Sequence, residues 1–288
     1  MSVSDLFRTY QRVVFSDVDG TLIDGEGRLP KAWPSIRHAL RDAMVVVTSS
    51  RTVEELLEIQ DALGIEGPFI AENGAVLVLT NEWIEHAQGT VISVAGRMLR
   101  LIPIGTPGAQ LSAIVKGAAA ASGVVIDTQR GVTTADVAHT PTAGPHTVTS
   151  HALARAHSLL LRISGSPELR LRFFATLTAA GLTVTHGGRW HVVQGGSSKG
   201  IAVRALLGIV RRRLSYDLCV IGVGDAENDR SLLEAVDLPF VVRRPDGQID
   251  PALQHIDGAY VAQAAGVEGW AEIVQHMHPA PTGGRAHE

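Results

Sequence analysis

The segment RVVFSDVDGTLID, residues 12–24, joins a short apolar run to two carboxylates. Residues 12–16 have the β-branched and aromatic character of a buried strand, and Asp17 and Asp19 follow that strand directly. Because side chains two positions apart in an extended backbone point the same way, both carboxylates are expected to face one point. A carboxylate at the end of a buried strand is costly unless something pairs with it. The segment therefore predicts a site at the end of a strand.

The chain on either side of this segment alternates between strand and helix patterns. Residues 12–16 and 44–50 predict strands, and residues 31–43 predict a helix. A T-x-x-E capping box at residues 52–55 predicts the start of a further helix, which ends at Gly64. A hairpin is expected to follow this helix, because two apolar runs flank an Asn-Gly pair.

The same alternation returns in the last third of the chain. The expected helices are residues 197–208, 226–237 and 266–277, and the expected strands are residues 216–225, 238–244 and 259–263. Alternating strands and helices indicate a parallel sheet with helices on both faces, and ligands bind such sheets beyond the carboxyl ends of the strands. We therefore predict an α/β fold, with a three-layer Rossmann-like core around a parallel sheet.

The middle of the chain has a different character. An amphipathic helix is expected over residues 167–182 and strands over residues 183–194, after a loop at residues 133–151. We interpret the middle as an inserted α+β domain. The predicted divisions are a core domain over residues 1–82 and 191–278, the inserted domain over residues 83–190, and a disordered tail over residues 279–288.

Composition and charge limit the classes of function. The chain has 288 residues, of which 45% are hydrophobic and 19% are charged, and these values are typical of a globular protein. A formal net charge of −4 gives no basic field that would attract nucleic acid or an anionic membrane. No apolar run of about 18 residues and no signal-peptide pattern are present, so a soluble, cytoplasmic protein is expected. No sequence pattern indicates an oligomeric state.

Polar groups follow several of the predicted strands. Asp225 ends one strand, and Asp229 lies one helical turn later, so both carboxylates can meet Asp17 at the same edge of the sheet. Several negative charges in one pocket repel each other and require a cation, and a set of oxygen ligands favours Mg²⁺. Thr48 and Lys199 offer a hydroxyl and a positive charge that could hold a phosphoryl group against the metal.

These motifs resemble those of the haloacid dehalogenase superfamily of phosphatases. The resemblance rests on DVDGTL, a threonine at a strand end, a lysine that opens a helix, and GDAEND, in that order. The long insertion between the second and third motifs is similar to the C2-capped, Cof-like branch, subfamily IIB, as is AENGAVL at residues 71–77. The inserted domain would then be a C2-type cap.

The resemblance implies a role for each matching residue. Asp17 would be the nucleophile that forms an aspartyl-phosphate, and Asp19 would be the general acid and then the general base. The implied metal positions are Asp17, Asp19 through its backbone carbonyl, Asp225 and Asp229, the last of these directly or through water. The implied phosphate-binding positions are Thr48, Ser49, Lys199 and Asn228, of which Asn228 could instead contact the metal shell.

Within this branch, the second half of the chain resembles mannosyl-3-phosphoglycerate phosphatases, through residues 171–203 and 224–242. Arg189, with backbone N–H groups at Gly188, could bind a glycerate carboxylate, although a solvent-exposed turn is the alternative. The family's R-x-x-S-E-P stretch is only partly present, since Arg155 and Ser158 match but the Glu and Pro do not. A glucosyl analogue or another sugar phosphate is therefore an open alternative.

Two other classes of function remain open at this point. Phosphomannomutases share the capped fold and the D-x-D-G-T motif, so a phosphotransferase is possible on the same scaffold. A catalytically silent binding protein would be expected to lose a nucleophile or a metal carboxylate, and this chain keeps them. Release of inorganic phosphate with no isomerised sugar would favour the hydrolase.

Overall fold

The computed structural model describes residues 12–24, 27–29, 31, 33–128, 146–147, 155, 157–187, 190–212 and 218–277. The chain divides into two compact units. The parallel-sheet unit comprises Ser4–Val45 and Tyr216–Glu288, and the antiparallel-sheet unit comprises Met1–Val3 and Val46–Ser215. The predicted divisions at residues 82/83 and 190/191 differ from this partition and stay a prediction.

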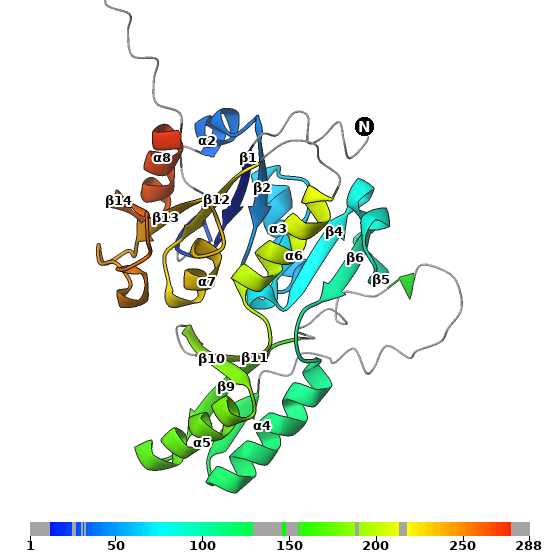
Figure 1. Cartoon of the computed structure of the whole chain (residues 1–288), viewed down its shortest axis with the longest axis vertical. Coiled ribbons are helices and arrows are strands. Elements are labelled where there is room, and N and C mark those ends of the chain that lie inside the picture. Colours follow the sequence, from blue (N-terminus) through cyan, green and yellow to red (C-terminus); the bar gives the residue numbers. More distant parts are fainter. Residues whose placement is uncertain are drawn as a thin grey trace, which may run out of the picture. The chain divides into compact units, whose positions relative to one another are not determined.

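The parallel-sheet unit is built on a five-stranded sheet (Figure 1). Its strand order is β14 (Tyr260–Ala265), β13 (Leu238–Arg243), β12 (Cys219–Gly224), β1 (Arg12–Ser16) and β2 (Ala43–Val47). Strand β1 pairs with β12 in parallel, β12 with β13 in parallel, and β13 with β14 in parallel. The predicted parallel sheet is confirmed, and the carboxyl ends of β1 and β12 lie side by side.

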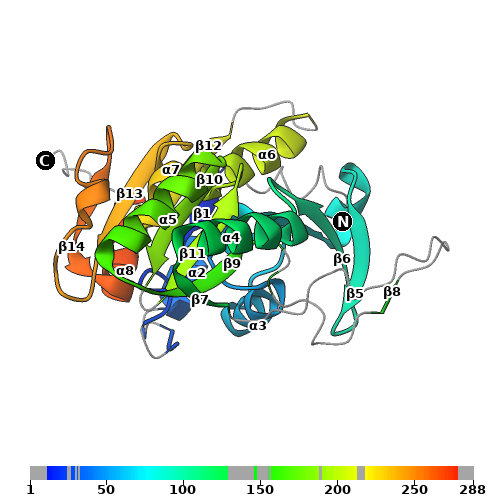
Figure 2. The same cartoon turned by 90° about the horizontal axis from the view of Figure 1, so that it is seen from below.

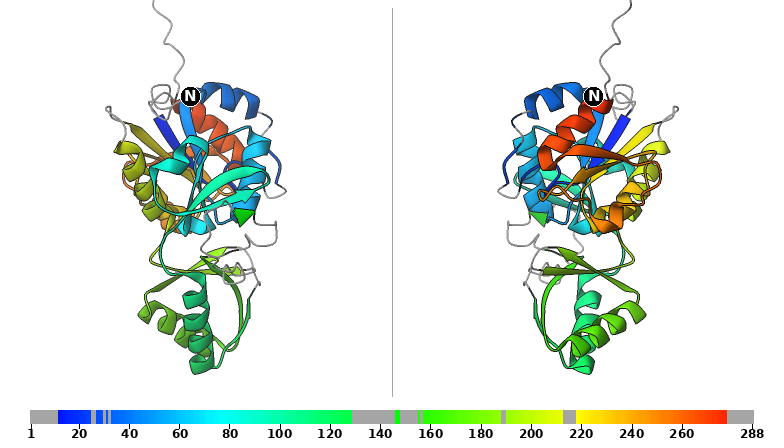
Figure 3. Two further views of the ribbon diagram at one scale, coloured as in Figure 1. Left: turned by 90° about the vertical axis from the view of Figure 1, so that its right-hand side faces the viewer. Right: turned by 90° about the vertical axis from the view of Figure 1, so that its left-hand side faces the viewer.

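Helices cover both faces of this sheet. Helix α7 (Arg230–Leu233) contacts β12 and β13 on one face, while α8 (Gly266–Met277) contacts β13 and β14 on the other (Figure 2). Helix α2 (Trp33–Ala39) lies beside α8 (Figure 3), and the ring centroids of Trp33 and Trp270 are 6.4 Å apart. This arrangement is the predicted three-layer core.

Two predicted helices of this unit are shorter than expected. The predicted helix at residues 31–43 is confirmed only over α2. The segment predicted as one helix over residues 226–237 forms the 3₁₀ helix η5 (Glu227–Asp229) and the short α7. It cannot continue to residue 237, because the backbone N–H of Asp237 donates to the Val220 carbonyl and the Asp237 carboxylate accepts from the Val220 N–H. Pairing with β12 therefore replaces helical hydrogen bonds.

The antiparallel-sheet unit contains a four-stranded sheet covered by two helices. The strand order is β10 (Leu182–Gly187), β11 (Trp190–Gly195), β9 (Leu159–Ser164) and β7 (Val125–Thr128), and all pairings are antiparallel. Helices α4 (Gly108–Ser122) and α5 (Pro167–Ala179) pack against this sheet and each other (Figure 2). Their shared core is apolar and includes Leu111, Val115, Leu161, Phe173, Leu177 and Val193.

The same unit holds a second sheet, which carries the AENGAVL segment around its first turn. Its order is β3 (Phe69–Ala71), β4 (Val76–Thr80), β6 (Arg97–Pro103), β5 (Thr90–Val94) and β8 (His146–Thr147). The predicted hairpin is confirmed, since β3 and β4 pair antiparallel around the 3₁₀ turn η1 (Glu72–Gly74). A second 3₁₀ segment, η2 (Asn81–His86), follows β4, and η6 (Pro251–Leu253) belongs to the parallel-sheet unit.

Helices α3 (Val53–Leu63) and α6 (Lys199–Arg211) contact this second sheet. The predicted capping box is confirmed, because the Thr52 hydroxyl accepts from the Glu55 N–H while the Glu55 carboxylate accepts from the Thr52 N–H. Gly64 ends α3 in the left-handed conformation, as predicted. Most of the predicted loop at residues 133–151 lies outside the described residues, except β8, which pairs with β5.

The α/β core with an α+β insertion is the predicted fold class, and it is confirmed by these elements. Among the described residues, no helix is long and apolar enough to cross a membrane.

Candidate active site

Asp17 directly follows β1, and its backbone is held on both sides. Its N–H donates to the Val223 carbonyl at 2.9 Å, which extends the parallel pairing of β1 with β12. Its carbonyl accepts from the Ser16 hydroxyl at 2.7 Å, and the same hydroxyl oxygen accepts from the Trp270 indole N–H at 2.8 Å. The buried Trp270 side chain on α8 therefore helps to fix where Asp17 leaves the sheet.

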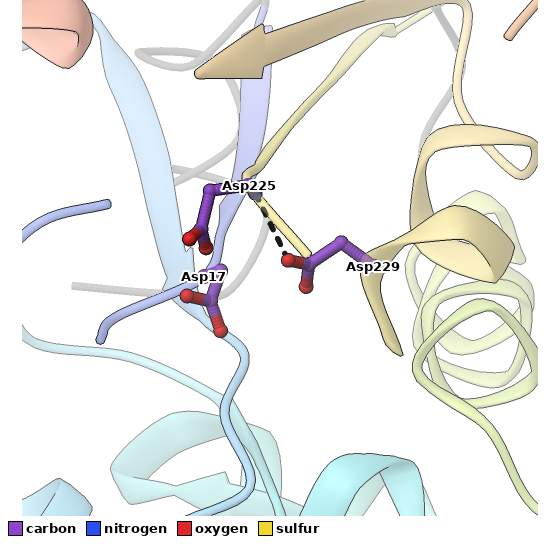
Figure 4. A group of neighbouring side chains, drawn as sticks. All are labelled: Asp17, Asp225 and Asp229. Carbon is purple, nitrogen blue, oxygen red and sulfur yellow. Dashed lines mark hydrogen bonds between the residues drawn. The ribbon is translucent and has the colours of Figure 1, made fainter. Parts of the chain in front are cut away.

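Three carboxylates converge at this edge of the sheet. One oxygen each from Asp17, Asp225 and Asp229 lies within 4.8 Å of the others (Figure 4). The three side chains are 5%, 7% and 0% exposed, respectively. Asp17 and Asp225 come from the ends of neighbouring parallel strands, and Asp229 from η5. We call these three residues the carboxylate cluster.

Local hydrogen bonds orient two members of the cluster. The Asp229 carboxylate accepts from the backbone N–H groups of Asp225 at 3.0 Å and Ala226 at 3.1 Å, so the i, i+4 spacing closes a tight turn (Figure 4). The Thr21 hydroxyl donates to Asp225 Oδ1 at 3.1 Å. The threonine of DVDGT thus positions a metal-ligand candidate that lies 204 residues further along the chain.

Gly20 allows the DVDGT loop to approach Asp225. Its φ of +83° lies in the left-handed region, and a Cβ at this position would come within 2.8 Å of Asp225 Oδ2. A side chain at residue 20 would therefore be strained by the backbone and would also displace a carboxylate of the cluster. A steric requirement therefore explains the glycine at this position of the motif, and the sequence alone did not reveal it.

The cluster is chemically suited to a divalent cation. Three like charges in a buried site repel each other strongly unless a cation neutralises them. Oxygen-only ligands suit Mg²⁺, whose bonds of about 2.0–2.1 Å place opposite ligands about 4 Å apart. Since one oxygen of each of the three residues lies within 4.8 Å of the others, this donor set suits one ion with water completing its shell.

Asp19 and Asn228 lie near the cluster in sequence and differ from it in exposure. Asp19 is exposed, whereas Asp17 is buried. The loop that carries Asp19 is compact, because the Val18 carbonyl accepts from the N–H groups of Leu22 at 2.8 Å and Ile23 at 2.9 Å. Asn228 is half-buried within η5. The roles assigned to Asp19 and Asn228 stay predictions.

Thr48 and Ser49, both fully buried, belong to the antiparallel-sheet unit. Thr48 forms an isolated parallel bridge with Ile70, and the Ser49 N–H donates to the Ile70 carbonyl at 3.0 Å. The Ser49 hydroxyl accepts from the Arg51 N–H at 3.2 Å. This loop is thus fixed against β3, and its predicted approach to the carboxylate cluster stays a prediction.

Lys199 is the first residue of α6 and is fully buried. The helix begins as predicted, with the Ser198 hydroxyl accepting from the Ile201 N–H at 3.2 Å. The start of a helix favours anions through its unpaired N–H groups and its dipole. A buried ammonium at this place is consistent with the predicted phosphate-binding role, which stays a prediction.

The position of Lys199 depends on residues that sequence reasoning did not single out. A Cβ at Gly74 would lie 2.5 Å from the Lys199 backbone nitrogen, so only glycine permits this approach. The Gln194 amide donates to the Ser197 carbonyl at 2.6 Å and accepts from the Asn73 amide at 3.2 Å. The Asn-Gly pair signalled a turn but gave no sign of its contacts with the start of α6. Gly188 and Arg189 lie outside the described residues.

Comparison with known proteins finds similarity to hydrolases and phosphatases. Residues 14–98 match the family of haloacid dehalogenase-like hydrolases. A glucosyl-3-phosphoglycerate/mannosyl-3-phosphoglycerate phosphatase from Methanococcoides burtonii is 28% identical over 272 residues, which are 93% of this chain and 97% of that protein.

Two solved structures show the same fold. A phosphatase of the haloalkanoate enzyme superfamily from Bacteroides thetaiotaomicron has a TM-score of 0.63 at 20% identity, covering 93% of this chain and 95% of that chain. The sucrose-phosphatase from Synechocystis sp. PCC6803, determined with sucrose and phosphate, has a TM-score of 0.59 at 15% identity. The match covers 93% of this chain and 98% of that chain. The resemblance predicted from the motifs is confirmed: the chain is similar to haloacid dehalogenase-like hydrolases and is an enzyme.

Proposed function

We propose that this enzyme is a Mg²⁺-dependent phosphomonoester hydrolase that acts on a sugar or sugar-acid phosphate. The carboxylate cluster supports the proposal most directly, because it combines a buried candidate nucleophile with two further acidic groups at one edge of a parallel sheet. Mg²⁺ held by Asp17, Asp225 and Asp229 would offset negative charge on the transferring phosphoryl group.

The proposed reaction has two displacements at phosphorus. In the first, an Asp17 oxygen attacks the phosphoryl group, the bond from phosphorus to the sugar oxygen breaks, and Asp19 gives its proton to the leaving alkoxide. In the second, Asp19 takes a proton from water, and that water releases inorganic phosphate and regenerates Asp17. The exposure of Asp19 supports this role, because a group that serves both the leaving alcohol and water must reach solvent.

The other motif residues are proposed to hold the phosphate. Thr48, Ser49 and Lys199 would contact its oxygens, and Asn228 would contact the phosphate or the metal shell. The burial of Lys199 at the first position of α6 supports this assignment, because a phosphate there gains both the ammonium charge and the helix terminus.

The proposed substrate is mannosyl-3-phosphoglycerate or its glucosyl analogue. The relative from Methanococcoides burtonii is named for both compounds, and it covers nearly the whole chain. Residues 83–190 would form the cap that selects the sugar, and Arg189 with Gly188 would bind the glycerate carboxylate. A cytoplasmic location, expected from the sequence, is part of this proposal.

A panel of phosphate esters tests the proposal. The panel contains both 3-phosphoglycerate glycosides, several hexose phosphates and p-nitrophenyl phosphate, each with Mg²⁺ or with EDTA. We expect inorganic phosphate from the glycosides only when Mg²⁺ is present, with no isomerised sugar phosphate. Isomerised product would instead indicate a phosphotransferase, and the absence of turnover on every ester would contradict the proposal.

A further inference from the structure

The turn Glu72–Gly74 has an unusual backbone. Its three residues have φ values of +50°, +59° and +92°, all in the left-handed region. Glycine adopts this conformation readily and asparagine tolerates it, but glutamate rarely does. Glu72 and Asn73 are also almost fully buried, at 1% and 3% exposure. A glutamate in a buried left-handed turn requires contacts that hold it there.

The backbone of this turn joins two segments of the antiparallel-sheet unit. The Glu72 N–H donates to the Arg51 carbonyl at 2.9 Å, and the Asn73 N–H donates to the Ser49 carbonyl at 2.8 Å. On its other side the turn packs against the start of α6, where Gly74 lies against Ser198 and Lys199. The turn therefore sets the position of the Ser49–Arg51 loop relative to Lys199.

The Glu72 side chain holds a third segment. Its Oε2 accepts from the His157 backbone N–H at 2.9 Å and from the Ser158 hydroxyl at 2.9 Å. Ser158 is fully buried, and its oxygen also accepts from Arg155 Nη1 at 3.3 Å. His157 and Ser158 lead directly into β9. One buried carboxylate thus fixes the chain where it enters the four-stranded sheet.

The charges around Glu72 are balanced. Burial lowers the pKa of Arg155, and the carboxylates of Glu72 and Glu55 act against that effect. Glu55 is also within 3.8 Å of Arg51. Two arginines therefore face two glutamates, so Arg155 is compensated by protein groups. This balance favours a structural tie over a binding site for an external anion.

We propose that Glu72 is a positioning residue, whose left-handed backbone aligns the Ser49–Arg51 loop with the start of α6 and whose carboxylate ties residues 155–158 to that turn. The proposal rests on the proposed function in one respect, since the two aligned segments matter for catalysis only if they bind phosphate. Glu72 contributes no chemistry to the reaction itself.

Four variants separate the backbone role from the carboxylate role. Glu72→Gly removes the strain of a non-glycine residue in the left-handed conformation, but it also removes the carboxylate. Glu72→Gln keeps the shape of the side chain and removes its charge. Ser158→Ala removes one donor to Glu72 and leaves the turn intact. Ser166→Ala is the matched control, because it removes an exposed N-cap hydroxyl of α5 in the same unit.

The first measurement is amide hydrogen exchange of peptides that cover residues 155–161 and 49–54. We expect exchange at residues 155–161 to rise at least tenfold in Glu72→Gly and severalfold in Glu72→Gln and Ser158→Ala. We expect Ser166→Ala to match the wild type in both peptides. Unchanged exchange in Glu72→Gly would overturn the tie, and this readout does not depend on any enzymatic activity.

The second measurement is the kcat and KM of each variant with p-nitrophenyl phosphate and with a 3-phosphoglycerate glycoside. Glu72→Gly should lower kcat at least tenfold with both substrates, because the turn loses the carboxylate contacts that hold it and glycine adds backbone freedom, so the two phosphate-binding segments lose their alignment. Ser158→Ala should raise KM for the glycoside severalfold and leave p-nitrophenyl phosphate unaffected. A purely structural loss would instead lower the active fraction equally for both substrates and leave KM unchanged.

The two proposals can fail separately. A wild-type protein that hydrolyses no ester contradicts the proposed function, and hydrogen exchange alone then decides whether Glu72 ties residues 155–158. An active wild type whose Glu72→Gly variant keeps both its exchange pattern and its kcat/KM within twofold overturns the inference and leaves the proposed function standing.

Discussion

The carboxylate cluster and the Glu72–Gly74 turn both bury acidic side chains that accept hydrogen bonds, but they differ in the charges that lie close to them. In the cluster, Asp17, Asp225 and Asp229 bring three negative charges within 4.8 Å. In the turn, Glu72 accepts two hydrogen bonds and has the positive charge of Arg155 close by. A carboxylate beside a protein cation is balanced by the protein, whereas converging carboxylates favour a cation from outside, even where some of them accept hydrogen bonds. Burial by itself therefore does not mark a functional acid.

The largest expected effect comes from replacing the candidate nucleophile. Asp17→Asn keeps the shape of the side chain but cannot form the aspartyl-phosphate, so kcat should fall by at least about a thousandfold. The fold should survive, because the backbone contacts of Asp17 with Val223 and Ser16 do not involve its carboxylate. Steady-state kinetics and circular dichroism measure both parts of this prediction.

Asp257→Asn is the matched control for this variant, because Asp257 is an exposed aspartate of the same unit. It should retain wild-type kcat. Substantial activity in a folded Asp17→Asn protein would show that the cluster is not the reacting centre, and the contrast with the turn would lose its functional meaning.

The second prediction concerns the metal: Asp225→Asn should be more stable than the wild type without Mg²⁺ and less stable than the wild type with it. Without Mg²⁺, Asp225→Asn should raise the melting temperature, because one of three mutually repelling charges is removed. With Mg²⁺ at 100 times its Kd, the wild type should gain about 2.7 kcal/mol of stability from binding, and the variant should gain much less. Thermal unfolding in EDTA and in Mg²⁺, for the wild type, Asp225→Asn and Asp257→Asn, tests the crossover.

Glu72→Gln provides the contrasting case in the same experiment. Its carboxylate is satisfied by protein donors, so the variant should be less stable than the wild type in EDTA and in Mg²⁺ alike. If Asp225→Asn and Glu72→Gln changed the melting temperature in the same direction under both conditions, the expected difference between the carboxylate cluster and the Glu72–Gly74 turn would be wrong.

The third prediction separates a steric clash from backbone strain. Gly20 and Gly27 have similar φ values of +83° and +77°, but a Cβ at Gly20 would clash with Asp225, and a Cβ at Gly27 would meet nothing within 4 Å. Both alanine variants should lose about 1 kcal/mol from strain. Only Gly20→Ala should also weaken Mg²⁺ binding, by about tenfold or more, as isothermal titration can measure. Equal Mg²⁺ affinity in the two variants would rule out the steric role.

The cluster could be predicted from the sequence, because local rules place its members. Asp17 follows a strand, Asp225 ends another strand, and Asp229 lies four residues later. Parallel strands with this pattern end at a common edge, so no long-range information was required beyond the fold class. The predicted parallel sheet, the hairpin at residues 69–80 and the caps of α3 and α6 followed from equally local signals.

The contacts of the turn could not be predicted, because they are not local. The sequence indicated a turn at Asn73–Gly74, but the partners of Glu72 lie 85 and 86 residues away. Nothing in the pattern around Ser158 shows that its hydroxyl faces a carboxylate. The helix expected over residues 226–237 was too long for a similar reason, since Asp237 pairs with Val220 in the neighbouring strand. Helix α4 went unpredicted because alanines lie on its exposed face as well as its buried face, which obscures the period of its buried residues.

The smallest expected effect involves a third acidic group, Glu272, which resembles Glu72 in being satisfied by donors. Its carboxylate accepts from the N–H groups of Gln263 and Ala264 and from the Tyr260 hydroxyl, at 2.7–3.0 Å. Desolvation acts to raise the pKa of Glu272, but these hydrogen bonds and the charge of His276 outweigh it, so the pKa lies below its ordinary value of 4.5.

The sign of the pH dependence follows from this lowered pKa. The ionised form of Glu272 is favoured in the folded protein, so its stabilisation is present above pH 4.5 and is lost as the pH falls through the lower folded pKa. Glu272→Gln should therefore lower the melting temperature at pH 7 by about 1–2 °C. Below pH 4 the difference in melting temperature between the variant and the wild type should become smaller. Glu268→Gln, on the exposed face of the same helix, is the control and should keep the wild-type pH profile. If Glu272→Gln instead gained stability at pH 7, as Asp225→Asn is expected to do without metal, the convergence of like charges would no longer explain the difference between the two kinds of carboxylate.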